Sequence, residues 1–309
     1  MIQAQGLSKK YKKKFAVDDL SFRVETGKVT GFLGPNGAGK STTMRLMLGL
    51  DNGGGKTTFD GKSLHSYAQP SKVVGILLEA KAFHPTRTAR QHLKILAAAG
   101  GIPMSRVEEA LDMVGLKDIG RKAPGKFSLG MSQRLGIAAA ILGKPKYLLL
   151  DEPANGLDPE GIAWLRDFLK EYADQGNAVF VSSHLLSEMS QMADNVVVIG
   201  KGKLIADTSI SELLAQNAHA GVLVRSPKLS QLEKLLKAKK IDTNRSETGL
   251  IVSGMTSDLI GKLAFENNVP IYELAPQAAS LEDVFLELTA DSGEYIGKSE
   301  GSEGSEAKK

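Results

Sequence analysis

The stretch Gly34-Pro35-Asn36-Gly37-Ala38-Gly39-Lys40-Ser41-Thr42 decides the fold of this chain. It follows an apolar run, Val29–Leu33, and precedes Thr43–Leu50, whose apolar residues are typical of a mostly buried helix. The order of strand, glycine-rich loop and helix, with the spacing G-x-x-x-x-G-K-S, predicts a phosphate-binding loop. Glycines let backbone N–H groups point at phosphate oxygens, and the helix N-terminus adds positive dipole. We expect Lys40 to reach the β- and γ-phosphates and Ser41 to hold Mg²⁺.

Length and composition limit the class of protein. A chain of 309 residues favours about two domains, and 42% apolar residues suffice for a substantial core. The net charge of +4 is mild, so no nucleic-acid partner is expected. The absence of cysteine excludes disulfides and thiolate metal sites and fits a reducing compartment. We find no signal-peptide layout and no apolar run near the roughly 20 residues of a membrane span; if the protein serves a membrane process, another chain supplies the spans.

Hydrophobic patterning divides the rest of the chain into parts. Antiparallel hairpins are expected before and after the glycine loop, the second of them at residues 57–62. Residues 82–145 show helical periodicity and predict an all-helical insertion. From residue 217 the order is close to β-α-β-β-α-β, with a strand expected at Val269–Leu274, which predicts a small α+β module. The tail, 291–309, is rich in Gly, Ser, Glu and Lys and is expected to be disordered.

A second apolar strand, Tyr147–Leu150, ends at the adjacent carboxylates Asp151 and Glu152. In a sheet that already holds a phosphate loop, this end of a strand is where a second Mg²⁺ contact belongs. We expect Asp151 to orient the metal through water and Glu152 to polarise the attacking water. The alternative is an ordinary turn that starts with Asp-Glu, and the glycine loop upstream argues against it.

Three further motifs accompany the glycine loop and the carboxylate pair. Ser128-Leu129-Gly130-Met131 lies between them, and Gly156-Leu157-Asp158-Pro159 and His184 follow the pair. In this order and spacing they resemble the nucleotide-binding subunit of an ABC transporter, and more narrowly the ATPases of drug and peptide-antibiotic exporters. The resemblance covers residues 1 to about 215, and the ending Ser280–Thr289 extends it to about 290.

The resemblance implies an α/β P-loop NTPase core in residues 1–216, with an antiparallel β subdomain and the helical subdomain at about 82–145. Residues 217–290 are expected to form a ferredoxin-like accessory domain. The implied activity is hydrolysis of ATP with Mg²⁺ to drive export through a separate polytopic membrane permease. The implied location is peripheral, at the cytoplasmic face of the cell membrane.

The resemblance also implies roles for single residues. Tyr11 is placed to stack on adenine, and the alternative is a surface tyrosine in a lysine-rich hairpin. Glu79 stands where the family usually has a glutamine that contacts Mg²⁺ and the membrane subunit. A carboxylate can also ligate Mg²⁺, but it adds negative charge near the γ-phosphate; the alternative is a surface glutamate that ends a strand. His184 is placed to sense the γ-phosphate and hold the attacking water in line.

Ser128 and Gly130 keep the family's signature loop, whereas Leu129 and Met131 depart from it. A hydroxyl and exposed N–H groups at a helix N-terminus form an anion site. If the helical insertion carries this site outward, it must meet the nucleotide of a second chain. The resemblance therefore implies a head-to-tail homodimer, or a pair with a similar ATPase, that shares two ATP molecules. Asp158 would lie along the seam and couple the two sites; the alternative is a capped helix start.

Two other functions stay open at this point. A soluble ABC ATPase that acts on ribosomes or DNA usually carries two ATPase cores or a long coiled coil, and this sequence shows neither. A regulator that binds ATP and barely hydrolyses it is disfavoured by Glu152 and His184. The module after residue 217 is expected to adjust dimer opening or partner choice, and the alternative is a passive dimer prop. The contacts with the transported cargo are expected on the membrane chain.

Overall fold

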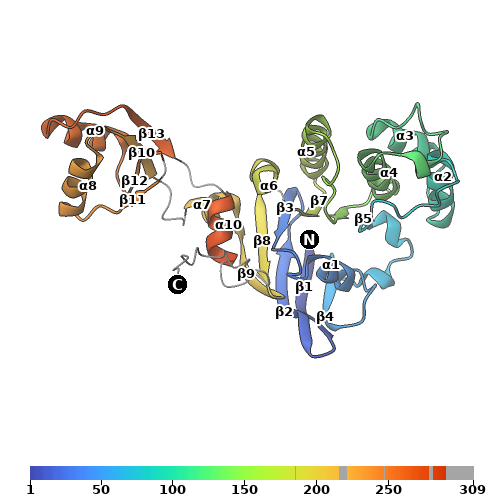
Figure 1. Cartoon of the computed structure of the whole chain (residues 1–309). Helices are drawn as coiled ribbons and strands as arrows, with labels where there is room; N and C mark the ends of the chain where they lie inside the picture. The colour runs from blue at the N-terminus through green and yellow to red at the C-terminus, as the bar shows by residue number, and fades with distance from the viewer. Residues whose placement is uncertain (185, 216–220, 247, 278–280, 290–309) are drawn as a thin grey trace, which may run out of the picture.

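The computed structural model describes residues 1–309 except 185, 216–220, 247, 278–280 and 290–309. The expected disordered tail therefore lies outside the described residues. Within the described part, the strands form three separate sheets, two in the body of the molecule and one in a module near the C-terminal end (Figure 1).

The central sheet has the strand order β5-β6-β7-β3-β8-β9 and is parallel except for β9. Its strands are β3 (Lys28–Leu33), β5 (Val74–Leu77), β6 (Tyr147–Leu150), β7 (Ala178–Ser182), β8 (Asn195–Gly200) and β9 (Lys203–Ser209). Side chains alternate across this sheet, so Phe32 and Phe180 join one hydrophobic cluster while Leu33 and Val181 join another. Because both faces are covered, these strands are nearly continuous apolar runs in the sequence.

Three segments that carry polar residues meet at the carboxyl-terminal end of the central sheet's parallel strands. Strands β3, β6 and β7 run parallel and in register, with Leu150 opposite Val181 and Phe32 opposite Ser182. The loop 34–39, the pair Asp151–Glu152 and the segment 182–184 therefore all follow carboxyl ends of neighbouring strands. Parallel pairing thus brings together residues that are more than a hundred positions apart.

A smaller antiparallel sheet has the order β2-β1-β4, with β1 Ile2–Tyr11, β2 Lys14–Val24 and β4 Gly54–Phe59. It packs on one face of the central sheet, where the ring of Phe22 lies 5.8 Å from that of Phe32 and 5.4 Å from that of Phe180. The hairpin expected at 57–62 is found only as a two-residue turn: β4 pairs with β1, and an isolated antiparallel bridge joins Phe59 to Lys62.

Three helices form a lobe beside β5: α2 (Ala89–Ala99), α3 (Ser105–Met113) and α4 (Leu129–Ile141) (Figure 1). The other helices of the body are α1 (Lys40–Met47), α5 (Pro159–Asp174), α6 (Leu186–Met192) and α7 (Ile210–Ala215). Among the described residues, no helix combines the length and apolar character needed to cross a membrane.

The C-terminal module has the sheet order β11-β12-β10-β13, and all its neighbours are antiparallel. Its elements are β10 (Gly221–Arg225), α8 (Leu229–Ala238), β11 (Thr243–Arg245), β12 (Leu250–Ser253), α9 (Ser257–Glu266) and β13 (Glu273–Gln277). Val224, Leu250, Leu236 and Ile260 belong to a core that is separate from those of the body. The strand expected at 269–274 is wrong in its bounds, because β13 starts at Glu273.

The last helix, α10 (Leu281–Thr289), returns to the body of the molecule. It contacts α6 and α7. Leu281 and Val284 are buried in the hydrophobic cluster that also contains Leu33 and Val181 of the central sheet. The expected boundary at residue 217 therefore separates α10 from the helices against which it packs.

Candidate active site

The loop 34–39 connects β3 to α1 and packs against β2 and the end of β8 with its following turn. Gly39 has a φ of +107°, and a Cβ at this position would lie 2.3 Å from the carbonyl oxygen of Ala16 in β2, so only glycine fits. The N–H of Gly202, in the β8–β9 turn, donates to the carbonyl of Ala38 at 3.0 Å. Asn36 and Gly37 are exposed. The loop is therefore anchored at its end and open at its tip, where an anion can reach backbone N–H groups.

Lys40, the first residue of α1, is the buried cation of the site. Its side chain is 8% exposed; the Nζ atom donates to the carbonyl of Gly34 at 2.6 Å and lies 3.9 Å from Oε1 of Glu152. Burial lowers the pKa of Lys40, and the carboxylates of Glu152 and Asp151 oppose that shift. Ser41, which follows it, is exposed. The structure thus places the ammonium between the glycine loop and the two predicted carboxylates.

Asp151 and Glu152 follow β6 and are held by Ser182 at the end of β7. The hydroxyl of Ser182 donates to Oδ1 of Asp151 at 2.5 Å and accepts the N–H of Glu152 at 2.9 Å. The N–H of Asp151 donates to the carbonyl of Leu77 in β5 at 2.7 Å. Glu152 has a φ of +49°, in the left-handed region that glutamate adopts uncommonly. Neighbouring strands therefore fix the carboxylate pair from both sides.

His184 contacts the carboxylate of Glu152 with both its ring and its backbone. Its Nδ1 atom lies 2.7 Å from Oε2 of Glu152, and its N–H donates to the same oxygen at 3.3 Å. The Glu152 side chain is 23% exposed and that of His184 is 51% exposed. Since the other oxygen of Glu152 faces Lys40, the three predicted catalytic residues form one connected group that solvent can reach.

A second group of predicted residues lies at the starts of α4 and α5. Ser128 is the N-cap of α4 and accepts the N–H of Met131 at 3.1 Å, and Asp158 caps α5 by accepting the N–H of Gly161 at 2.8 Å. A Cβ on Gly130 would lie 3.0 Å from the carbonyl of Gly156, so the two helix starts are neighbours. Figure 1 shows α4 in the helical lobe, apart from α1 and the glycine loop.

Two predicted residues lie outside these groups. Tyr11 ends β1, is 50% exposed, and donates its hydroxyl to Asp51 at 3.3 Å, which joins it to the segment after α1. The ammonium of Lys9 lies over the Tyr11 ring, 5.1 Å from the centroid, so stacking of a base would need the opposite face. Glu79 is exposed two residues beyond β5, where its carbonyl accepts the N–H of Ala82 at 3.4 Å. Neither contact joins these side chains to Lys40.

Two residues that the sequence analysis missed hold Glu152 in place. One is Ser182, and the other is Gln133 on α4, whose amide donates to the carbonyl of Glu152 at 3.2 Å. The signal available for Ser182 was a polar residue at the end of an apolar strand, two positions before the predicted His184. Gln133 lies five positions after Ser128 in a mostly apolar helix, and a glutamine in such a helix was the available signal.

The oxygen ligands of this site fit Mg²⁺ only when the phosphates of a bound nucleotide supply further ligands. Among the described residues, no cluster of three or more His, Cys, Asp or Glu side chains could hold a metal ion alone. Asp151 and the hydroxyl of Ser41 are hard oxygen ligands, and Mg²⁺ is commonly held by one or two such groups together with phosphate oxygens and water.

This fold and this site define an ATP-binding P-loop ATPase of mixed α/β class. The family profile described as "ABC transporter" matches residues 17–155, and a profile described as a domain of unknown function matches residues 220–282. The chain is 37% identical to the uncharacterized ABC transporter ATP-binding protein YhcH of Bacillus subtilis, over 96% of this chain and 98% of that protein. It is 35% identical to the bacitracin transport ATP-binding protein BcrA of Enterococcus faecalis, over 95% and 97%.

A solved structure has a similar fold: the dimeric post-hydrolysis state of an ATP-binding cassette bound to ADP and phosphate. It aligns with a TM-score of 0.62 and 21% identity over 68% of this chain and 99% of that one. The chain belongs to the ABC transporter family of ATP-binding proteins, and it is an ATPase whose hydrolysis of ATP is coupled to transport. The predicted family and fold class are confirmed.

Proposed function

We propose that this chain energises the export of an antibiotic peptide, a drug or a lipid-like compound through a separate polytopic membrane subunit. The observation that carries the proposal is the 35% identity to a bacitracin transport ATP-binding protein over nearly the full length of both chains. This likeness includes the C-terminal module and favours transport over an action on ribosomes or DNA. The place of action is then the cytoplasmic face of the cell membrane, where the chain is held by its membrane partner.

The working unit of this proposal is a head-to-tail dimer; the similar cassette bound to ADP and phosphate is dimeric. The separation of α4 from α1 supports it, because the exposed Ser128 and the half-buried Gly130 then serve the nucleotide of a second chain. Each triphosphate joins the loop 34–39 and Lys40 of one protomer to the start of α4 in the other. Loss of the γ-phosphoryl group removes that joint, so the dimer opens.

The hydrolytic step uses the group around Glu152. Its carboxylate, held between Lys40 and His184, polarises the attacking water, and the ring of His184 orients the water toward the γ-phosphate. Mg²⁺ would be held by Ser41 and Asp151, with Glu79 as a further oxygen ligand, and it would neutralise charge on the phosphates. Tyr11 stacks on the adenine, and Asp158 couples the two sites along the dimer seam.

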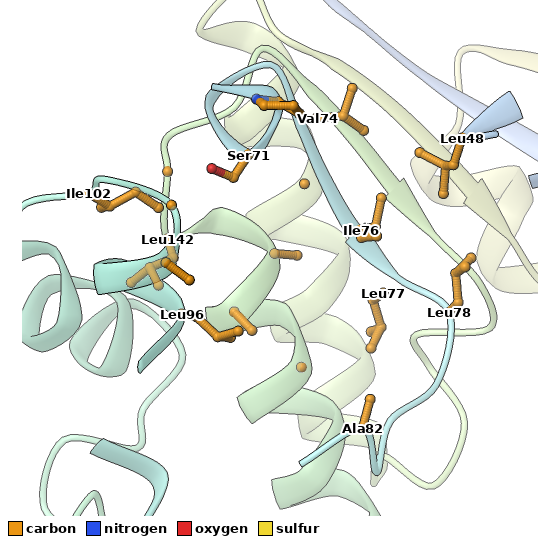
Figure 2. A pocket seen from close by; sticks show the side chains of 18 of the residues that line it. Leu48, Ser71, Val74, Ile76, Leu77, Leu78, Ala82, Leu96, Ile102 and Leu142 are labelled. Carbon is orange, nitrogen blue, oxygen red and sulfur yellow. The ribbon is translucent and has the colours of Figure 1, made fainter. Parts of the chain in front are cut away.

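The membrane subunit docks in an apolar pocket of about 1010 Å³ between β5 and the helical lobe. Figure 2 shows side chains of β5 on one side of this pocket and of α2 and its neighbours on the other. The labelled apolar side chains include Leu48, Val74, Ile76, Leu96, Ile102 and Leu142. Among the described residues that line it, Glu79 is the one carboxylate, so docking and the nucleotide site share this residue. A short helix with an apolar face fits such a groove.

Replacement of Glu152 by glutamine tests the proposed mechanism. We expect ATP turnover to fall by roughly 100-fold or more, because the base is lost, while nucleotide binding is retained. With Mg-ATP the variant should accumulate as a dimer, measured by light scattering after size-exclusion chromatography, and ADP should leave it monomeric. Turnover equal to that of the parent chain would remove Glu152 from the mechanism. A variant that stays monomeric with saturating Mg-ATP, alone and with its membrane subunit, would overturn the dimer.

Replacement of Ile76 by aspartate tests the docking pocket. Ile76 lies on β5, is 41% exposed and lines the pocket, so a charge there should abolish co-purification of the membrane subunit. The ATPase of the isolated chain should persist. The control is Leu204→Asp on β9, at the opposite edge of the same sheet and 40% exposed, which should co-purify normally. Equal co-purification of both variants contradicts this docking site.

A further inference from the structure

Gln133 on α4 is a buried side chain whose contacts all lead to one turn. The residue is 4% exposed, and its Nε2 atom donates to the carbonyl of Glu152 and to that of Asn155, each at 3.2 Å. An amide group carries two N–H donors, and these two carbonyls use both of them. The helix that begins at Ser128 is therefore tied to the turn that contains Glu152.

The orientation of this amide follows from the groups that face it. With the amide reversed, its oxygen would point at two carbonyl oxygens and no donor would separate them. In the observed orientation Oε1 is buried and has no hydrogen-bond partner among the described residues. The amide of Gln133 thus keeps one buried acceptor without a partner while both of its N–H groups donate, which points to a role in hydrogen bonding rather than in packing.

The turn needs these donors because Glu152 holds an uncommon backbone conformation, with a φ of +49°. Its N–H is held by the hydroxyl of Ser182 at 2.9 Å, and its carbonyl accepts both from Gln133 and from the N–H of Asn155 at 3.2 Å. Both peptide groups that flank the Cα of Glu152 are thus fixed by side chains. These two contacts hold the backbone from which the carboxylate of Glu152 reaches Lys40 and His184.

We propose that Gln133 is a positioning residue for Glu152: it holds the backbone of residues 152–155 so that the carboxylate points at the attacking water. The proposal rests on the proposed function, since it takes Glu152 as the group that polarises water. It also gives α4 two tasks, because the helix presents Ser128 to the partner's nucleotide and orients the glutamate of its own chain.

The test replaces Gln133 by methionine, which keeps the length of the side chain without donors, and by glutamate, which keeps its shape. For both variants we expect kcat for ATP to fall about tenfold or more, because a misplaced base loses its alignment. The KM for ATP and the affinity for a non-hydrolysed ATP analogue should stay within about twofold of the parent values, because neither carbonyl contacts the nucleotide loop.

Arg106→Met is the matched control. Arg106 is 7% exposed and also donates to two carbonyls of α4 or its end, those of Ile141 and Leu142, each at 3.2 Å. These lie eight residues or more along the helix, roughly 12 Å from Gln133. We expect the control and the Gln133 variants alike to lower the thermal unfolding midpoint. The control, however, should leave kcat unchanged. A drop in kcat that follows stability in all three variants would make Gln133 merely structural.

A double variant separates positioning from other effects. Adding Gln133→Met to Glu152→Gln should not reduce turnover further, because Gln133 acts through a carboxylate that is already gone. An additive loss, or an unchanged kcat in the single variants, overturns the proposal. If Glu152→Gln itself fails to form a dimer with Mg-ATP, the proposed function fails instead, while the comparison of kcat between Gln133→Met and Arg106→Met still decides the role of Gln133.

Discussion

At the scale of single residues, the site depends on one hydroxyl as much as on its charged groups. Lys40, Asp151 and Glu152 could be predicted because a glycine loop and a strand end carry local sequence signals. The role of Ser182 could not, because it follows from β7 lying between β6 and β3 in the sheet. Strand order is a long-range property, and Ser182 and Ser183 are equivalent in the sequence until the pairing is known.

Replacement of Ser182 by alanine tests this contact. The hydroxyl is fully buried, so its loss should lower the free energy of unfolding by about 1–3 kcal/mol and leave the N–H of Glu152 unpaired. We also expect kcat for ATP to fall more than nucleotide affinity does, since Asp151 and Glu152 both lose a support. The control, Ser190→Ala, removes a hydroxyl on α6 that donates to the carbonyl of Ser187, and unfolding should change by less than about 0.5 kcal/mol. Wild-type kcat in Ser182→Ala would contradict the supporting role.

At the scale of elements, helix starts were predicted better than short strands. The caps at Ser128 and Asp158 have side-chain acceptors that the sequence displays directly. The strand expected at 269–274 was wrong in its bounds because Val269 is buried without being part of a strand. It is 4% exposed and packs in the core of the C-terminal module from the loop between α9 and β13. Burial produces an apolar run whatever the local conformation, so a short run does not identify a strand.

The start of α5 allows capping and coupling to be separated. Asp158→Ala removes the acceptor for the N–H of Gly161 and should lower the free energy of unfolding by about 1 kcal/mol, whereas Asp158→Asn keeps an acceptor and should be nearly neutral. Denaturant titration measures both. If Asp158 also couples two nucleotide sites, the asparagine variant should lose cooperativity of ATP turnover at unchanged stability. Normal cooperativity in the asparagine variant would leave Asp158 with the cap as its role.

At the scale of the whole molecule, the chain leaves the body after α7, forms a module with its own core, and returns as α10. The sequence Leu281–Leu288 indicated a helix at this place. Its contacts with α6 and α7 could not be predicted, because they join segments about 70 to 90 positions apart in the sequence. The return places α10 against α6, the helix that begins two residues after His184. The module is thus connected at both ends to the half of the body that holds His184.

Replacement of Leu281 by alanine tests whether α10 belongs to the stability of the ATPase core. Leu281 is 1% exposed within the core cluster, so the change should lower the free energy of unfolding by about 2–5 kcal/mol. The one tryptophan of the chain, Trp164, lies on α5, so its fluorescence reports on the body and not on the module. The control on the same helix is Leu286→Ala, at a position 65% exposed, which should change unfolding by less than about 0.5 kcal/mol. If the Trp164 transition were the same in both variants, α10 would contribute nothing to the core, and a truncation before residue 281 would leave the ATPase intact.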